Sequence, residues 1–298
     1  IKQNNHTIYF EEYGNPLGIP VIFLHGGPGS GCNEGQKAIF NYKKYRVVFL
    51  DQRGSGKSTP KGEIKNNTTL KLINDIEVVR KYLKIEKWIV VGGSWGATLA
   101  VAYAQIHTDR VEAMILRAVF LGTKKEIEWA FFDAPLKFRP ELIYRLNDFL
   151  NNKKLINPIF TLGKMLENKN KKIRILGADL WLAYESNLST IQFDYNTFNE
   201  VLSNSGKKKK ILPNTPFLEW HYIKNNFFLK PNQLIKHKKK LSKIKISIIQ
   251  SDYDLLCPPQ TSFNFASGLS NCKVIRIASA GHYISCLLYT SDAADDGL

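Results

Sequence analysis

The feature that most constrains the fold is a serine in a glycine-rich turn, Gly-Gly-Ser-Trp-Gly at residues 92–96. An apolar run, 88–91, precedes this turn, and a run of small residues, 97–104, follows it. The order predicts a strand, a sharp turn and a helix, with Ser94 at the turn. Glycines flank the serine because neighbouring Cβ atoms would clash with its strained backbone. We expect the turn to lift the Ser94 hydroxyl above a sheet, and the competing interpretation is a serine that only caps the helix.

Apolar runs alternate with a helical pattern along the first part of the chain. Runs typical of strands lie at residues 7–13, 21–24, 46–50, 88–91 and 113–116, and residues 70–83 have helical spacing. This alternation predicts the α/β class, in which a mainly parallel sheet is flanked by helices.

The character of the sequence changes near residue 122. Residues 123–232 are rich in aromatic side chains, Lys and Asn and poor in strand-like runs, so we expect a helical cap inserted into the sheet domain. Strand patterns resume at 244–249 and 273–277. Residues 1–122 and 233–285 are therefore expected to form the core.

Composition narrows the classes of function. The 298 residues, 44% hydrophobic, suffice for one large α/β domain with a smaller insertion. The net charge is +16, but the dense lysine patches at 207–210 and 236–240 lack interleaved aromatic residues, so no nucleic-acid partner is expected. No apolar run has the length of a membrane span, and no membrane partner is expected. None of the four cysteines forms a Cys-x-x-Cys pair, which predicts neither a zinc site nor a disulfide framework and favours the cytoplasm.

The end of the chain has the pattern of a foreign segment. Residues 286–295 can be back-translated into a sequence that resembles a transposase-based sequencing adaptor read in frame. We therefore expect residues 286–298 to be a non-native tail and the natural chain to continue differently beyond about Ser285. The chain starts at Ile1 without a Met, so the sequence is compatible with a leader segment before it.

Candidate partners for the serine follow the late strands. A serine nucleophile needs a base, an acid that orients the base, and donors for the oxyanion. The apolar run 246–250 is followed by Asp252 and Asp254, at the strand end where functional groups collect in α/β sheets, and either could be the acid. Of six histidines, His282 alone follows a late strand through a glycine turn. We predict a catalytic triad of Ser94, His282 and one of these aspartates.

A loop after an early strand has the composition of an oxyanion site. Residues 25–29 read His-Gly-Gly-Pro-Gly and follow the apolar run 21–24. The backbone N–H groups of Gly27 and Trp95 are the predicted donors, and such a donor contributes about 3 kcal/mol to catalysis. His25 is expected to brace the loop rather than act as a base.

A second loop ends like a phosphate-binding loop. Residues 56–58 read Gly-Lys-Ser, but Asp51 stands where that motif has its first glycine. A carboxylate there would repel phosphate, so nucleotide binding is not expected.

Together these motifs resemble the proline iminopeptidases (prolyl aminopeptidases), a serine peptidase family with the α/β-hydrolase fold. The matching segments lie at residues 25–31, 51–60, 92–96, 116–121 and 253–258, and the likeness extends to about Ser285. The resemblance implies an α/β-hydrolase fold with a helical cap, release of N-terminal proline from small peptides through an acyl-enzyme on Ser94, and no metal or organic cofactor. It also favours Asp254 over Asp252 as the triad acid.

The resemblance assigns substrate-binding residues as well. Two cap segments match those in which the family carries acidic residues, which makes Glu185 and Glu219 candidate anchors for the charged imino group. A partly buried pair of carboxylates would select a charged N-terminus, whereas the plain alternative is two surface glutamates. Phe120 is expected in the proline pocket. Ile223 and Tyr184 replace aromatic residues usual in the family, which bears on substrate preference more than on reaction class.

Three other functions stay open at this point. One is an esterase or amidase that does not need a free amine, and another is a non-catalytic binding module with the same fold. The third, a basic nucleic-acid-associated protein, predicts binding to duplex DNA that weakens steeply with salt. An intact Ser94, Asp254 and His282 argue against the binding module.

Overall fold

The computed structural model describes residues 1–152, 154–192, 194–203 and 214–283. The chain forms two compact units, which are described separately. The first contains Ile1–Lys124, Pro213–Ile248 and Thr261–Val274, and the second contains Lys125–Leu212, Ile249–Gln260 and Ile275–Leu298. The predicted tail at 286–298 and the lysine patch at 207–210 lie outside the described residues.

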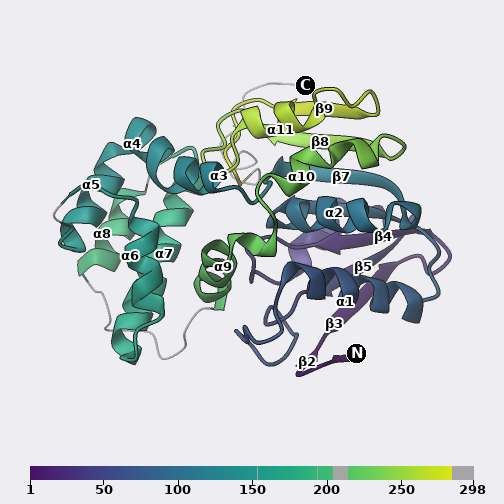
Figure 1. Ribbon diagram of the computed structural model, residues 1–298, viewed down its shortest axis with the longest axis horizontal. Coiled ribbons are helices and arrows are strands. Elements are labelled where there is room, and N and C mark those ends of the chain that lie inside the picture. The colour runs from purple at the N-terminus through teal and green to yellow at the C-terminus, as the bar shows by residue number, and fades with distance from the viewer. Residues whose placement is uncertain (153, 193, 204–213, 284–298) are drawn as a thin grey trace, which may run out of the picture. The chain divides into compact units, whose positions relative to one another are not determined.

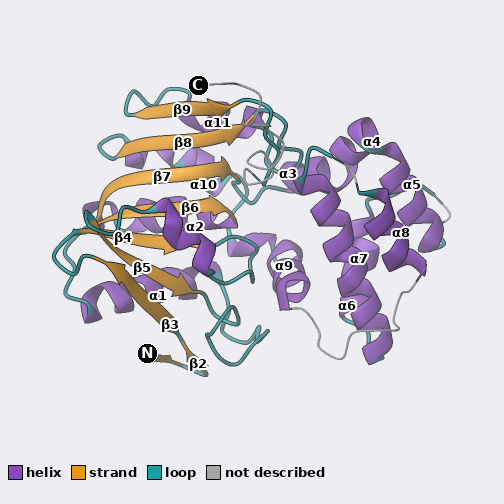
Figure 2. Cartoon of the chain, turned by 180° about the vertical axis from the view of Figure 1, so that it is seen from behind, coloured by secondary structure: helices purple, strands orange, loops and turns teal. Residues whose placement is uncertain are grey.

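A seven-stranded sheet has the order β3-β5-β4-β6-β7-β8-β9, with β9 at one edge and β3 at the other (Figure 2). Its strands are β3 (Tyr9–Gly14), β4 (Ile19–Leu24), β5 (Tyr45–Asp51), β6 (Trp88–Ser94), β7 (Val111–Val119), β8 (Lys245–Ser251) and β9 (Cys272–Ile277). Strand β4 pairs in parallel with β5 and β6, and β6 with β7, whereas β3 pairs antiparallel with β5. Two short strands, β1 (Lys2–Gln3) and β2 (His6–Thr7), form a separate antiparallel pair. The predicted α/β class is confirmed.

The central strands are buried because their apolar runs are continuous. The side chains of 21–24 on β4 and 47–50 on β5 are buried without alternation, as is typical of parallel strands covered on both faces. Val21, Phe23 and Phe49 belong to one core cluster. The predicted strand at 7–13 instead divides between β2 and β3, and β3 lies at the edge with partly exposed side chains.

The sheet region also contains five α-helices among its described residues. They are α1 (Thr69–Tyr82), α2 (Trp95–Ile106), α9 (Asn214–Lys224), α10 (Gln233–Lys236) and α11 (Pro259–Ala266). Helix α1 starts after Thr68, whose side chain accepts from the backbone N–H of Lys71. Helices α1 and α2 lie side by side on one face of the sheet (Figure 1). Nearly every residue of helix α2 is buried, which is possible because its sequence is mostly apolar or small on all sides.

The described residues between 125 and 203 form helices and contain no strand. These helices are α3 (Lys124–Glu128), α4 (Ala134–Phe138), α5 (Pro140–Phe149), α6 (Pro158–Leu166), α7 (Lys171–Ser189) and α8 (Tyr195–Ser203). Tyr184 of α7 is buried, and its hydroxyl donates to the carbonyl oxygen of Phe131 at 2.9 Å. It stays a prediction that residues 123–232 form a cap on the core. Helix α9, which lies within that predicted range, belongs to the same compact unit as β4 and β5.

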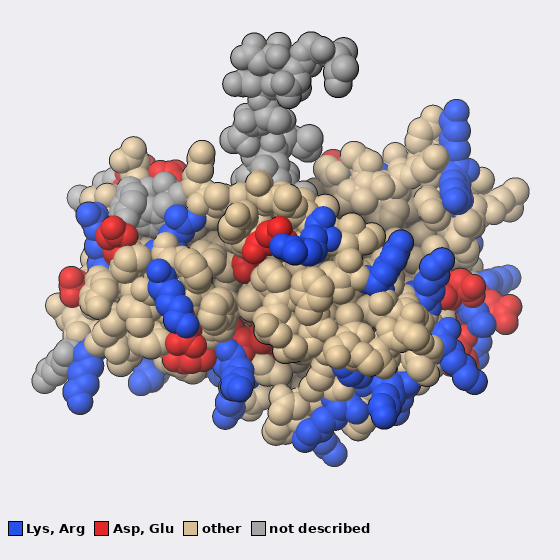
Figure 3. Space-filling model, turned by 90° about the horizontal axis from the view of Figure 1, so that it is seen from above, with Lys and Arg blue, Asp and Glu red and all other residues tan. Residues whose placement is uncertain are grey.

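The basic residues do not form one continuous patch on the face shown in Figure 3. Lys and Arg side chains stand there singly or in small groups, with uncharged surface between them. Lys238, from the dense patch at 236–240, donates to the carbonyl oxygens of Asn264 and Ser267 near the end of α11. Part of the excess charge therefore stabilises the fold. No helix in the described part of the chain is long and apolar enough to cross a membrane.

Candidate active site

Ser94 ends β6 in a strained backbone conformation, and α2 begins at the next residue. Its φ is 55° and its ψ is −124°, a region that costs a non-glycine residue about 1–3 kcal/mol. The Ser94 side chain does not cap α2. The interpretation of Ser94 as a simple helix cap is therefore wrong, and a strained backbone of this kind is typical of residues at functional sites.

Close backbone contacts explain the glycines around Ser94. A Cβ atom on Gly96 would lie 2.1 Å from the carbonyl oxygen of Leu24, and one on Gly92 would lie 2.3 Å from the carbonyl oxygen of Gly96. The start of α2 thus packs directly on the end of β4. On the other side, a Cβ atom on Gly26 would lie 3.7 Å from the Cβ atom of Ser94. The loop after β4 therefore lies against the serine.

His25 braces this loop. Its Nδ1 contacts the carbonyl oxygen of Gly26 at 2.9 Å, and its Nε2 accepts from the backbone N–H of Gln52 at 3.0 Å. These contacts require a neutral ring with the proton on Nδ1, and burial lowers the pKa of His25 accordingly. Gly27 has a φ of 104°, which favours glycine. Trp95 is the first residue of α2, where a backbone N–H has no partner within the helix.

Aromatic side chains surround the residue that follows the serine. The ring centroid of Trp95 lies 4.7 Å from that of Tyr222 and 5.7 Å from that of Phe227. Phe227 also packs edge-on against Phe120, with centroids 5.1 Å apart. Glu219 lies on α9 in the same compact unit and is buried. This unit thus holds Ser94, both predicted oxyanion donors, Phe120 and one of the two predicted amine anchors.

The segment that presents Phe227 is strained. Asn226, Phe227 and Phe228 have φ values of 50°, 55° and 53°, three consecutive left-handed residues without a glycine. Each such residue costs about 1–2 kcal/mol. The Thr69 hydroxyl donates to the carbonyl oxygen of Phe227, and burial of the Phe227 ring offsets part of the cost.

Asp254 and His282 form a buried pair in the second unit. Oδ2 of Asp254 lies 2.8 Å from Nδ1 of His282, and the two residues are 2% and 6% exposed. Oδ1 of Asp254 accepts from the backbone N–H groups of Leu256 at 3.0 Å and Cys257 at 2.8 Å. The carboxylate therefore holds the His282 proton on Nδ1, which leaves Nε2 as the basic nitrogen.

The second candidate acid has a different partner. Asp252 accepts from Nε of Arg276 at 2.8 Å, in a pair whose arginine is exposed. Of the two aspartates that the sequence left open, Asp254 is thus the one in contact with His282.

Backbone contacts fix the turn that carries His282. A Cβ atom on Gly281 would lie 2.9 Å from the carbonyl oxygen of Ser189, at the end of α7. The same oxygen accepts from the N–H of Tyr283 at 3.0 Å, and the N–H of Tyr253 donates to the carbonyl oxygen of Ala280 at 3.0 Å. A hydrogen bond between backbone groups therefore joins the loop that carries Asp254 to the loop that carries His282.

Among the described residues, one group of His, Cys and acidic side chains could hold a metal ion. Its potential ligand atoms, on Asp254, Cys257 and His282, all lie within 4.8 Å of one another. Both oxygens of Asp254 already accept hydrogen bonds or contact the imidazole. The arrangement suits an oriented histidine base better than a metal centre.

The two predicted amine anchors belong to different units. Glu185 lies on α7 in the second unit and is half-buried, whereas Glu219 lies on α9 in the first unit. Neither is a fully exposed surface glutamate. Gln52 is a buried residue for which the sequence predicts no role, and the one local signal for it is a polar side chain directly after a buried strand.

The strained serine turn, the mostly parallel sheet and the buried Asp–His pair define an α/β hydrolase. The family model for the alpha/beta hydrolase fold matches residues 19–286. Among solved structures, a proline iminopeptidase-related protein from Thermus thermophilus has a TM-score of 0.61 at 19% identity, with 95% of this chain and 89% of that one covered. The metagenomic α/β hydrolase MGS-M2 has a TM-score of 0.60 at 17% identity, with 94% and 89% covered. These likenesses show the fold.

Sequence relatives identify the family more narrowly. A probable proline iminopeptidase from Leptolyngbya boryana is 36% identical over 278 residues, which cover 93% of this chain and 85% of the relative. The proline iminopeptidases from Arabidopsis thaliana and Neisseria gonorrhoeae are 36% and 35% identical, with 93% of this chain and 72% and 87% of the relatives covered. The chain belongs to the proline iminopeptidase family, and the resemblance drawn from the motifs is confirmed.

Proposed function

We propose that the protein is a serine exopeptidase that releases N-terminal proline from small peptides. The observation that carries this proposal is the buried contact between Asp254 and His282. It occurs in a chain that has a strained turn at Ser94 and that belongs to the proline iminopeptidase family. The cytoplasm is the proposed setting, and small peptides are the proposed partners. The described cysteines, Cys32, Cys257 and Cys272, form no disulfide with one another, which is compatible with a reducing compartment.

The proposed reaction begins at Ser94. Nε2 of His282 takes the proton from the Ser94 hydroxyl as Oγ attacks the carbonyl carbon of the proline residue. The carbonyl π electrons move onto oxygen, and the N–H groups of Gly27 and Trp95 stabilise that oxyanion. Asp254 stabilises the imidazolium and keeps the ring oriented.

Collapse of the tetrahedral intermediate breaks the peptide bond. His282 gives its proton to the departing amine, and proline stays bound to Ser94 as an ester. Water then attacks the ester carbonyl carbon while Nε2 of His282 takes a proton from the water. When the second tetrahedral intermediate collapses, the bond between Oγ of Ser94 and the carbonyl carbon breaks, His282 returns the proton to Oγ, and free proline leaves.

Selection of a free N-terminus is assigned to the two glutamates. Glu219 is buried, and a buried carboxylate is stabilised by a cationic partner, such as the imino group of an N-terminal proline. Glu185 is the second proposed anchor. Phe120 is the proposed wall for the proline ring, with Phe227 packed behind it.

The test compares three substrates: a proline arylamide with a free imino group, its N-acylated form, and a simple ester. We expect the wild type to cleave the free arylamide and leave the N-acylated form intact. Glu219→Gln and Glu185→Gln should each lower kcat/KM for the free form by about tenfold to a hundredfold, because each loses a charge-assisted hydrogen bond. Equal cleavage of the free and blocked forms, together with the ester, would instead identify a general esterase or amidase. No cleavage of any of the three would support a binding module.

A further inference from the structure

We propose that Gln52 is a positioning residue that fixes the two oxyanion donors, Gly27 and Trp95, relative to each other. The inference rests on the proposed function, because it assumes the roles given there to those two N–H groups. It concerns a different residue, which touches neither the substrate nor Ser94 in the proposed reaction.

The Gln52 side chain joins two separate elements. Its Oε1 accepts from the indole Nε1 of Trp95 at 2.7 Å, and its Nε2 donates to the carbonyl oxygen of His25 at 2.8 Å. Its backbone N–H donates to Nε2 of His25 at 3.0 Å. Gln52 is 3% exposed, so water does not compete for these bonds. One amide group thus connects the first residue of α2 to the first residue of the loop after β4.

Both contacts lie close to the proposed donors along the chain. Trp95 carries one donor on its own backbone, and His25 precedes Gly27, which carries the other, by two residues. The indole cannot turn freely, because the rings of Tyr222 and Phe227 pack against it. Because Gln52 holds both the indole of Trp95 and the carbonyl group of His25 in place, it also fixes the positions of the two backbone N–H groups.

The chemistry of the bridge requires an amide. The indole N–H needs an acceptor and the His25 carbonyl oxygen needs a donor, and a glutamine side chain supplies both. A carboxylate at this position would accept from Trp95 but repel the carbonyl oxygen of His25. An apolar side chain would leave both groups without a partner in a buried site.

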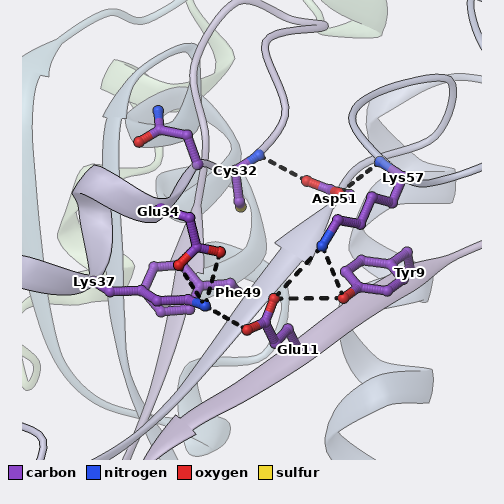
Figure 4. A pocket seen from close by; sticks show the side chains of 9 residues that line it. Tyr9, Glu11, Cys32, Glu34, Lys37, Phe49, Asp51 and Lys57 are labelled. Carbon is purple, nitrogen blue, oxygen red and sulfur yellow. Dashed lines mark hydrogen bonds and ion pairs between the residues drawn. The ribbon is translucent and has the colours of Figure 1, made fainter.

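The preceding residue holds the other end of the same loop. Oδ1 of Asp51 accepts from the N–H of Cys32, and Oδ2 accepts from the N–H of Lys57, each at 2.7 Å. Figure 4 shows both contacts beside a cavity of about 290 Å³. A Cβ atom on Gly56 would lie 2.3 Å from the Asp51 carboxylate, so this contact is close-packed. Two consecutive residues at the end of β5 therefore fix the loop from His25 to Cys32 at both of its ends.

The expected consequence concerns the transition state alone. Oxyanion donors act only when their N–H groups point at the charge that develops on the carbonyl oxygen, and small displacements reduce their contribution. The proposed contacts to ground-state proline come from Glu185, Glu219 and Phe120. Loss of the Gln52 bridge should therefore lower kcat and leave KM nearly unchanged.

The experiment uses Gln52→Met, with Gln105→Met as the matched control. Gln105 is also a buried glutamine; its Nε2 donates to the carbonyl oxygen of Leu234 at 2.7 Å, at the other end of α2 from Ser94. For Gln52→Met we expect kcat on a proline arylamide to fall by about thirtyfold to a hundredfold, with KM within twofold. Binding of a proline aldehyde, which forms a tetrahedral adduct on Ser94, should weaken by the same factor, whereas inhibition by free proline should not change. The control should keep kcat within twofold.

A second pair of variants tests the bridge without emptying the Gln52 site. Trp95→Phe keeps the backbone donor and most of the ring but removes the indole N–H, and it should lower kcat by about fivefold to tenfold. The double variant should be no slower than Gln52→Met alone, since both changes remove the same bridge. Multiplied effects in the double variant would overturn the proposal, as would unchanged kcat in a folded Gln52→Met enzyme. Equal weakening of the aldehyde and of free proline would assign Gln52 a general structural role and also overturn it.

Failure of the proposed function would look different. In that case wild-type enzyme would not cleave the proline arylamide, or Ser94→Ala would retain activity. A wild type that depends on Ser94 but tolerates Gln52→Met would overturn only the role of Gln52.

Discussion

The turns that carry Ser94 and Asp254 depend on different local features. The Ser94 turn depends on the absence of side-chain atoms, since a single Cβ atom on Gly96 would reach the Leu24 carbonyl oxygen. The Asp254 turn depends on hydrogen bonds, since its carboxylate accepts from two backbone N–H groups and contacts His282. Added volume at Gly96 should therefore damage the Ser94 turn itself, and lost polar atoms at Asp254 should damage the Asp254 turn.

The largest expected effect is on the hydrogen-bonded region. Asp254→Asn can still accept from the backbone N–H groups, but its amide cannot hold the His282 proton on Nδ1. We expect kcat on a proline arylamide to fall by about 10³–10⁴-fold, the loss typical of a triad with the wrong histidine tautomer.

Asp252→Asn is the matched control, two residues away after the same strand. It removes only a pair with the exposed Arg276, so kcat should stay within about twofold. A nearly inactive Asp252→Asn beside an active Asp254→Asn would reverse the assignment of the acid.

The second largest expected effect concerns the Ser94 turn, where close packing leaves no room for a Cβ atom at position 96. Gly96→Ala should lower the free energy of unfolding by about 3 kcal/mol or more, because backbone atoms must move to accept the methyl group. Gly268→Ala, at a φ of 73° with no atom within 4 Å of the added Cβ, should cost about 1 kcal/mol from backbone conformation alone. Urea denaturation of the two variants measures the difference, and equal losses would contradict close packing as the reason for Gly96.

The smallest effect concerns the far end of β6 and α2. Trp88 donates to the Tyr103 hydroxyl, which donates to Glu77, and Glu77 also accepts from Arg80. Although burial raises the pKa of the Glu77 carboxyl, the hydrogen bonds from Arg80 and Tyr103 outweigh it and lower this pKa to about 2. This network supports the strand and helix of the Ser94 turn at a distance from the serine.

The sign of the pH effect follows from that lowered pKa. The ionised Glu77 stabilises the fold at pH values above its unfolded pKa of about 4.3, and this contribution is lost as the pH falls toward 2. Glu77→Gln should be less stable by about 2 kcal/mol at pH 7, with the gap closing between about pH 5 and pH 2 and kcat unchanged. A gap that does not depend on pH would show that packing, not charge, is what Glu77 contributes.

The strands of the sheet could be predicted because their signal is local. The apolar runs at 21–24 and 46–50 lie within β4 and β5, since a covered parallel strand needs a continuous apolar sequence. Helix α11 was not predicted, because its short sequence carries few apolar positions and its start is marked only by Pro259. The antiparallel pairing of β3 was also outside the prediction, since strand direction depends on distant partners.

The candidate site was predictable as a set of motifs but not as a set of contacts. Asp252 and Asp254 follow the same strand, so their spacing alone left both open. The family resemblance favoured Asp254, and the contacts with Arg276 and His282 distinguish the two in the structure. The bridge by Gln52 joins residues that are 27 and 43 positions away from it, so no local pattern could reveal it. Sequence spacing locates strand ends, whereas contacts between strand ends depend on the packed structure.

The left-handed run at 226–228 has a consequence for engineering a more heat-resistant enzyme. A glycine at position 227 would relieve the unfavourable φ angle but delete the ring that packs against Trp95 and Phe120. Phe228 carries the same unfavourable angle with a side chain that is 37% exposed. The Phe228 ring nevertheless packs edge-on against Tyr222, with centroids 5.4 Å apart, and Tyr222 packs against Trp95. A glycine at position 227 would therefore remove a direct contact of Trp95, whereas a glycine at position 228 would relieve the same φ angle and disturb Trp95 only through Tyr222.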